Sequence, residues 1–171
     1  MKVAILLITI LFSGLISTSA DESKDEVLNV RHLAPTGTIF KEAPYENMWY
    51  YRTEILNKTK QPLRIVWFES YLKYNGHWYG ANVLGKTLRS KEFSSWYTEG
   101  DTIKNGVINP GEKAVCDVNW HGNKDPEFIP TKWAFIAVDD NGNDYFVEAV
   151  IDREITKHVK YKPNTSFKST Q

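Results

Sequence analysis

The chain has 171 residues, of which 42% are hydrophobic and 13% aromatic, and its 21 basic residues balance 21 acidic ones. This length suits one domain that buries its own core. The charge balance leaves no basic surplus for a phosphate backbone, so nucleic acid is not expected as a partner. The single cysteine, Cys116, cannot form an internal disulfide.

The first twenty residues have the pattern of a secretory signal peptide. Lys2 precedes a short apolar run, and the small residues that end at Ala20 suit a cleavage site. The run is shorter than a membrane span requires. We therefore expect residues 1–20 to be removed and the protein to be secreted or periplasmic. Residues 21–26 carry four acids and no apolar residue, which predicts a flexible acidic leader.

Strand patterns begin after this leader. Residues 27–33 and 38–41 are predicted to be short strands, and residues 47–57 alternate apolar with polar positions, as in a half-buried strand. The run LRIVWFESYLKY, residues 63–74, is apolar on both faces and predicts a central strand. Within it, we expect Trp67 to be a buried core residue.

A hairpin follows, because Asn75-Gly76 separates this central run from the aromatic run 77–84. Residues 85–106 fit either a short helix or an irregular crossover strand, and both alternatives remain open.

Further strands are predicted at 113–120, 131–139 and 144–155, the last two joined by a hairpin turn. In residues 113–120, Cys116 alternates with polar positions and falls on the apolar side, so we expect it to be a buried, unreactive thiol. Residues 156–171 form a basic tail that we expect to be partly disordered.

This succession of short strands and turns, with almost no helix, predicts one all-β domain over residues 27–155. The expected architecture is an antiparallel β-sandwich, immunoglobulin-like or fibronectin-like in its strand count and its Trp-bearing central strand. A jelly roll or a small barrel is the alternative.

No catalytic motif is present: the chain has no nucleophile elbow, no H-E-x-x-H zinc motif and no phosphate-binding loop. We therefore expect that the protein is not an enzyme and that it binds no cofactor. Residues 139–144, DDNGND, lack the glycine position of a calcium loop and predict a turn. His77, Asp117 and His121 are weak metal candidates, because Asp117 and His121 would share a strand face that His77 could approach. Solvated side chains are the ordinary alternative.

Two N-glycosylation triplets occur, at Asn57 and at Asn164. Both are predicted to lie exposed and outside strands, and both matter only if the source organism is eukaryotic.

Six Trp and nine Tyr are more large aromatic residues than one core of this size needs. We expect Trp78, Tyr79, Trp96 and Tyr97 to line one exposed patch. The predicted function is an exported, non-catalytic interaction module that binds a protein partner through a sheet edge or this aromatic patch. The alternative is a carbohydrate-binding module that stacks exposed Trp and Tyr on sugar rings, and a metal-binding protein is a third possibility.

Overall fold

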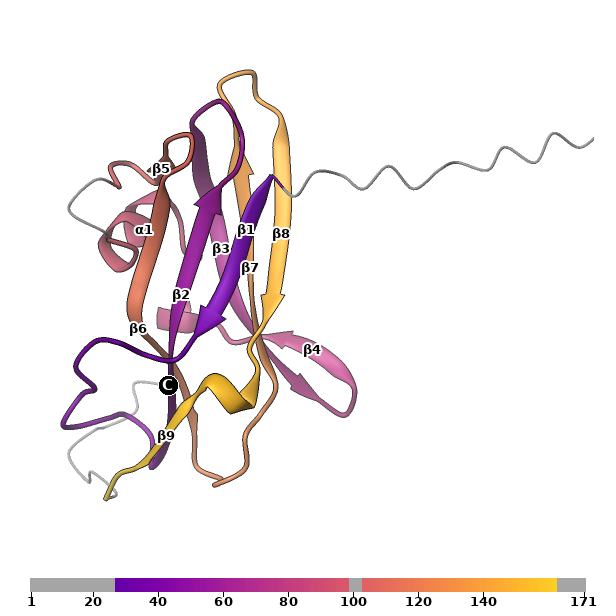
Figure 1. Cartoon of the computed structure of the whole chain (residues 1–171). Helices are drawn as coiled ribbons and strands as arrows, with labels where there is room; N and C mark the ends of the chain where they lie inside the picture. The colour runs from indigo at the N-terminus through magenta and orange to yellow at the C-terminus, as the bar shows by residue number, and fades with distance from the viewer. Residues whose placement is uncertain (1–26, 99–102, 163–171) are drawn as a thin grey trace, which may run out of the picture.

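The structure is a computed structural model that describes residues 27–98 and 103–162. The predicted signal peptide and acidic leader lie outside these residues. The described chain is an antiparallel β-sandwich of two sheets with one short α-helix (Figure 1). The first sheet contains β1 (Leu28–Leu33), β2 (Asn47–Asn57), β6 (Lys113–Asn123) and β9 (Lys157–Lys160). The second sheet contains β3 (Leu63–Tyr74), β4 (His77–Gly80), β5 (Val107–Ile108), β7 (Thr131–Val138) and β8 (Asp144–Val150).

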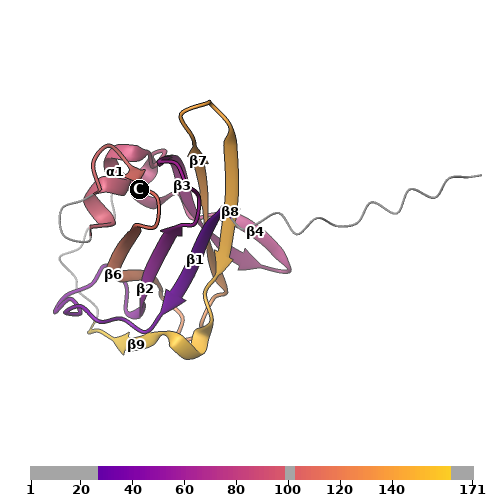
Figure 2. The same ribbon diagram turned by 45° about the horizontal axis from the view of Figure 1, so that its top comes forward.

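Each sheet is built around one long central strand. In the first sheet, β2 pairs with β6 on one side and with β1 and β9 on the other. In the second sheet, β3 pairs with β7, which carries β8, and also pairs with β4 and β5. β1 and β8 lie together at one side of the sandwich, and β6 and the helix α1 (Ser90–Trp96) lie at the other (Figures 1 and 2). Among the described strands β6 pairs only with β2, so it is an edge strand.

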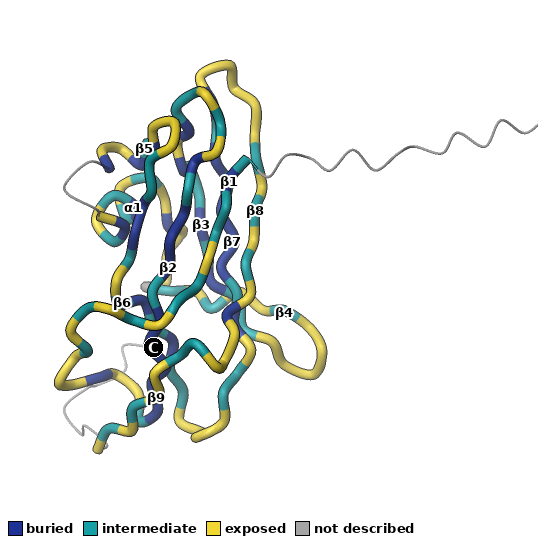
Figure 3. The backbone as a smooth tube through the Cα atoms, in the orientation of Figure 1, coloured by how far each residue is buried: buried dark blue, intermediate teal, exposed yellow. Residues whose placement is uncertain are grey.

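The core between the sheets is largely aromatic. Phe68 of β3 stacks on Phe135 of β7, and Trp133 of β7 donates its indole N–H to the buried Tyr51 hydroxyl at 2.8 Å. α1 adds Phe93, which is fully buried. The tube in Figure 3 shows the resulting pattern, with β2 dark along most of its length and the β4 hairpin exposed at its tip.

The sequence predicts the sandwich and both hairpins correctly, and the immunoglobulin-like strand order stays a prediction. Asn75 and Gly76 have φ values of 48° and 82°, as the predicted tight hairpin requires. Residues 139–143 form the turn between β7 and β8, and Asp144 begins β8. Of the two alternatives for residues 85–106, the helix is correct, and the backbone N–H of Arg89 donates to Glu92 at its start.

Four details of the predicted strand ends, domain boundary and loops are wrong. Residues 38–41 are not a strand, and the second arm of the last hairpin ends at Val150 instead of residue 155. The sheet continues past the predicted domain boundary, because β9 pairs with the beginning of β2. Asn57 is fully buried at the end of β2 instead of lying in an exposed loop. The other glycosylation triplet, at Asn164, lies outside the described residues.

A β-bulge in β3 reverses the predicted orientation of Trp67. The pairing of β3 with β7 shifts between Ile65 and Trp67, which places one extra residue on β3. Ile65 and Phe68 therefore point into the core, and Trp67 is only half-buried on the other face. Phe68, with no exposed surface, occupies the core position that we predicted for Trp67.

A second bulge lies in β6. Thr53 of β2 pairs with Cys116, but Tyr51 pairs with Asn119, so β6 also holds one extra residue. As a result, Cys116, Asn119 and His121 all face the space between the sheets, whereas a regular strand would turn the last two outward.

The outer face of the first sheet is partly covered by the loop that joins β1 to β2. Ala43 in this loop packs with Met48 and Tyr50 of β2 in a second small core. The loop is tied to the residue that follows β9, because the Tyr161 hydroxyl donates to the Phe40 carbonyl at 2.5 Å. Within the described residues, no helix has both the length and the apolar character needed to cross a membrane.

Candidate binding groove

A groove of about 500 Å³ opens where β6 faces the second sheet. We call it the β6 groove. One wall is β6 itself, and the residues of that strand that line the groove are Cys116, Val118, Asn119, Trp120, His121 and Gly122.

The position of these residues shows that the groove runs along the edge of β6. Successive side chains of a strand point to opposite faces of its sheet. Five consecutive residues, Val118 to Gly122, line the same groove. Val118 and Trp120 pack against the outer cluster that contains Met48 and Tyr50, whereas Asn119 and His121 face the other sheet, so a space that residues of both faces line lies beside the strand. The groove therefore follows the edge strand of the first sheet.

The opposite wall comes from the second sheet and its connections. Leu72 of β3 and Trp133 of β7 contribute apolar side chains, and Trp96 is supplied by α1. Ser70 of β3 lies among them as a buried polar group. The segment Ala81–Val83, which follows β4, completes this wall.

Two exposed aromatic residues form the outer rim. Phe40 and Tyr45, both from the loop between β1 and β2, are 48% and 43% exposed. Aromatic and aliphatic walls with a few polar groups, in a space of this size, are typical of ligand-binding sites.

His121 is a buried polar residue of the groove whose ring nitrogens lack hydrogen-bond partners. It is only 7% exposed, and neither ring nitrogen has a hydrogen-bond partner within the described residues. Its ring stacks on Trp49 at a centroid distance of 5.4 Å. Burial lowers the pKa of His121 to about 4, so the ring is neutral at physiological pH and offers one donor and one acceptor.

Asn119 lies two residues before His121 in β6. Unlike the ring nitrogens of His121, both polar atoms of its side-chain amide are hydrogen-bonded. The amide nitrogen donates to the hydroxyls of Thr53 (3.2 Å) and Tyr97 (3.4 Å), and the oxygen accepts from the backbone N–H of Trp120 (2.9 Å). Asn119 therefore holds the floor of the groove in place.

Cys116 is half-buried at the inner end of the groove, on the face that the sequence predicts. Burial raises the pKa of its thiol to about 11, which leaves almost no thiolate at neutral pH. The groove therefore does not hold an activated nucleophile at this position.

The four residues of the predicted aromatic patch do not form one surface. Tyr97 is fully buried and stacks on Phe93. Trp96 is half-buried against Phe68 and lines the β6 groove. Trp78 lies on the β4 hairpin with Lys132 Nζ 4.8 Å from its ring centroid, and Tyr79 is 54% exposed beside Tyr74. Tyr97 directly follows α1, and its backbone N–H donates to the Phe93 carbonyl, which turns its ring inward.

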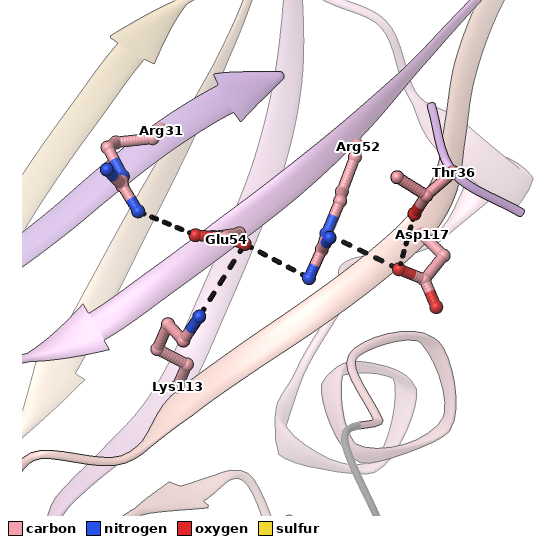
Figure 4. A network of polar contacts seen from close by, with 6 residues as sticks. All are labelled: Arg31, Thr36, Arg52, Glu54, Lys113 and Asp117. Atoms are coloured by element: carbon pink, nitrogen blue, oxygen red, sulfur yellow. Dashed lines mark hydrogen bonds and ion pairs between the residues drawn. The ribbon is translucent and has the colours of Figure 1, made fainter. Parts of the chain in front are cut away.

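The three weak metal candidates are also separated. His77 is exposed on the β4 hairpin, and His121 is buried between the sheets because of the bulge in β6. Asp117 points outward, where its carboxylate accepts from the Thr36 hydroxyl at 3.1 Å and pairs with Arg52 at 3.3 Å (Figure 4). No group of three or more potential metal ligands occurs among the described residues.

The sequence does not predict the β6 groove, although several residues that line it are candidates for other roles. His121 appeared only as a metal candidate, Trp96 only as part of a surface patch and Cys116 only as a core thiol. Their proximity depends on the bulge in β6 and on the packing of α1, and neither leaves a periodic signal. The available clue was a long strand, residues 113–120, that could lie at an edge.

Comparisons with known proteins give no family. No protein-family model matches the chain, and no curated protein matches its sequence. A solved structure described as an ApaA protein from Bordetella pertussis is similar with a TM-score of 0.43 and 15% identity, over 72% of this chain and 89% of that chain. The Northeast Structural Genomics Consortium target SoR45 is similar with a TM-score of 0.43 and 12% identity, over 86% of this chain and 94% of that one. Likenesses this distant do not assign a function.

Proposed function

We propose that this protein is an exported, non-catalytic interaction module that binds a protein partner through the edge of β6. The observation that carries the proposal is the run of five consecutive β6 residues, Val118 to Gly122, along one groove. An edge strand presents backbone N–H and C=O groups on its unpaired side, which suits the main chain of another protein. The aromatic walls supply apolar area that a partner can bury.

The alternative, a carbohydrate-binding module, needs flat aromatic rings exposed in one plane. The two exposed rings of the β4 hairpin, Tyr74 and Tyr79, are inclined by 55° to one another. They do not offer one continuous platform, so the geometry favours a protein partner over a sugar.

The test compares two exposed phenylalanines. Phe40 lies at the rim of the β6 groove, and Phe146 is 63% exposed on β8 of the second sheet. Phe40→Lys should weaken partner binding by at least about tenfold, because it removes an apolar contact and adds a charge at the groove. Phe146→Lys, the matched control, should leave binding unchanged.

Partners are isolated from the exported protein fraction with the immobilised wild-type domain, and binding to each variant is measured by titration. In the complex, amide hydrogen exchange should slow at Val118–Gly122. A partner that binds Phe40→Lys as tightly as wild type, with unchanged exchange in β6, would contradict the proposal.

A further inference from the structure

We propose that a basic pocket beside α1 binds the phosphate group of a small phosphorylated ligand. The pocket has a volume of about 570 Å³ and lies on the side of the sandwich where α1 and β5 are found (Figure 1). We call it the α1 pocket, and its polar lining residues are Arg64, Arg89, Ser90, Lys91, Ser94 and Asn105. It shares no lining residue with the β6 groove, so this inference does not depend on the proposed function.

Three cations and no acid line the α1 pocket. Arg64 lies on β3, Arg89 immediately precedes α1, and Lys91 is in the first turn of that helix. All three residues are exposed, and no ion pair to any of them occurs among the described residues. The adjacent acid, Glu92, is occupied, because it pairs with Lys86 at 2.6 Å and accepts from the Arg89 backbone N–H at 3.1 Å. The pocket therefore gathers three positive charges that the fold does not neutralise.

Arg64 also borders a neighbouring depression that Asp139 and Asp140 line. The Asp139 carboxylate already accepts hydrogen bonds from three other side chains, and neither aspartate forms an ion pair with Arg64. Arg89 and Lys91 do not line this depression. Substitutions of these two residues therefore report on the α1 pocket alone.

Hydrogen bonds hold the base of the pocket in one arrangement. The Ser90 hydroxyl donates to the Ile65 carbonyl at 2.6 Å, and the Ile65 backbone N–H donates to the Gly106 carbonyl at 2.9 Å. The Gly106 N–H in turn donates to the Ser94 hydroxyl oxygen at 2.6 Å. Because this oxygen already accepts a bond, the Ser94 hydroxyl can donate its hydrogen to a ligand. Val66, at the bulge in β3, completes the lining.

A phosphate group suits this set of side chains. A phosphate monoester carries almost two negative charges at neutral pH and has three strong acceptor oxygens. A guanidinium group can give two parallel N–H donors to such oxygens, and a lysine adds a point charge. A carboxylate, with one charge, would neutralise less of the pocket. The volume is in the range of small-molecule sites.

The first experiment titrates the ¹⁵N-labelled protein with glycerol 3-phosphate at pH 7.5 and about 0.15 M salt, which screens long-range attraction. The amide signals of Arg89–Ser94 and Asn105 should shift and saturate. Because the cations are exposed to water, we expect a dissociation constant on the order of 1 mM. Glycerol, the uncharged control, should shift none of these signals, and acetate should bind at least about fivefold more weakly.

The second experiment repeats the titration at pH 5.5. A phosphate monoester loses its second charge near pH 6, so glycerol 3-phosphate should bind about fourfold more weakly than at pH 7.5. Inorganic sulfate stays doubly charged and should bind equally well at both pH values. The pocket lining contains no histidine and no carboxylate, so the difference between the two ligands reports the charge of the ligand.

The third experiment removes the cations. Arg89→Gln should weaken binding of glycerol 3-phosphate by at least about fivefold, because charge-assisted hydrogen bonds are lost. Arg89→Gln combined with Lys91→Gln should abolish saturable binding. Lys104→Gln is the matched control, because Lys104 is exposed and adjacent to Asn105 but does not line the pocket. It should change the affinity by less than about twofold at this salt concentration.

Saturable shifts at the α1 pocket that are lost in the double variant support the inference. Three results would overturn it: no saturation up to about 50 mM ligand, equally tight binding of acetate, or an equal loss of affinity in Lys104→Gln. The last result would mean diffuse attraction to a basic surface. Partner binding by Arg89→Gln should equal that of wild type, so the outcome here is separate from the test of the β6 groove with Phe40→Lys.

Discussion

Asn57 closes β2 with a side chain whose hydrogen bonds are all made inside the protein. Its amide nitrogen donates to the carbonyls of Gln61 and Ile108, each at 2.9 Å. Its amide oxygen accepts from the backbone N–H of Thr59 at 2.9 Å and from the Thr59 hydroxyl at 2.7 Å. The Asn-x-Thr triplet that looks like a glycosylation site is thus a structural turn, in which Thr59 orients Asn57.

Replacement of Asn57 should therefore destabilise the fold. Asn57→Ala leaves two carbonyls and two donors without this partner, and we expect the free energy of unfolding to fall by about 2–4 kcal/mol. Urea denaturation measures the change, with Asn141→Ala at an exposed turn position as the control. The control should differ from wild type by less than about 0.5 kcal/mol. An equal, small effect of both substitutions would contradict this role of Asn57.

At the scale of the elements, the two bulges decide which side chains reach the interior. A bulge inserts one residue, and every side chain beyond it moves to the other face of the strand. In β3 this change brings Phe68 into the core, and in β6 it brings His121 to the groove. The location of the candidate site therefore depends on one extra residue in an edge strand.

Substitutions in β3 test the bulge directly. Phe68 has no exposed surface and contacts aromatic rings of α1 and β7. Phe68→Ala should lower the free energy of unfolding by about 3–5 kcal/mol, the usual cost of deleting a buried aromatic side chain. Trp67→Ala should cost clearly less, because Trp67 is half-buried. Denaturant unfolding of both variants provides the comparison, and a larger loss for Trp67→Ala would place the bulge elsewhere.

The same bulges mark the limit of prediction from the sequence. Residues 63–74 identify a central strand correctly, but Val66, Trp67 and Phe68 are all apolar, so alternation cannot show where its phase changes. Hairpins are predictable because Asn75-Gly76 acts locally. His121 is not, because its orientation depends on the pairing of β6 with β2, whose residues lie far away in the chain.

At the scale of the whole molecule, four buried or hydrogen-bonded groups link stability to pH. Burial lowers the pKa of His32 to about 4, although the bond to the Ala149 carbonyl partly opposes this shift, and burial lowers that of His121 to about 4. Hydrogen bonds, first of all from Asn143, lower the pKa of Asp139 to about 2. Burial alone would raise the pKa of Glu54, but the bond from Arg31 and its other cationic neighbours outweigh burial and lower it (Figure 4).

These shifts predict that acid destabilises the protein in two stages. An unfolded histidine has a pKa of 6.5, so between pH 6.5 and about 4 the unfolded chain binds protons that the folded chain does not. The free energy of unfolding therefore decreases as the pH is lowered from 6.5 to about 4, by up to roughly 3 kcal/mol for each histidine. The carboxylates stabilise the fold above their ordinary pKa values, and this contribution is lost as the pH falls from about 4 toward 2.

His121→Phe separates the two stages. It removes one of the two histidines that cause the first stage, so the loss of stability between pH 6.5 and about 4 should be roughly halved. The loss below about pH 4 should match wild type, because Asp139 and Glu54 are unchanged. Urea unfolding of both proteins across this pH range measures the two slopes. A wild-type stability that does not change between pH 6.5 and 4 would mean that neither histidine stays neutral in the fold.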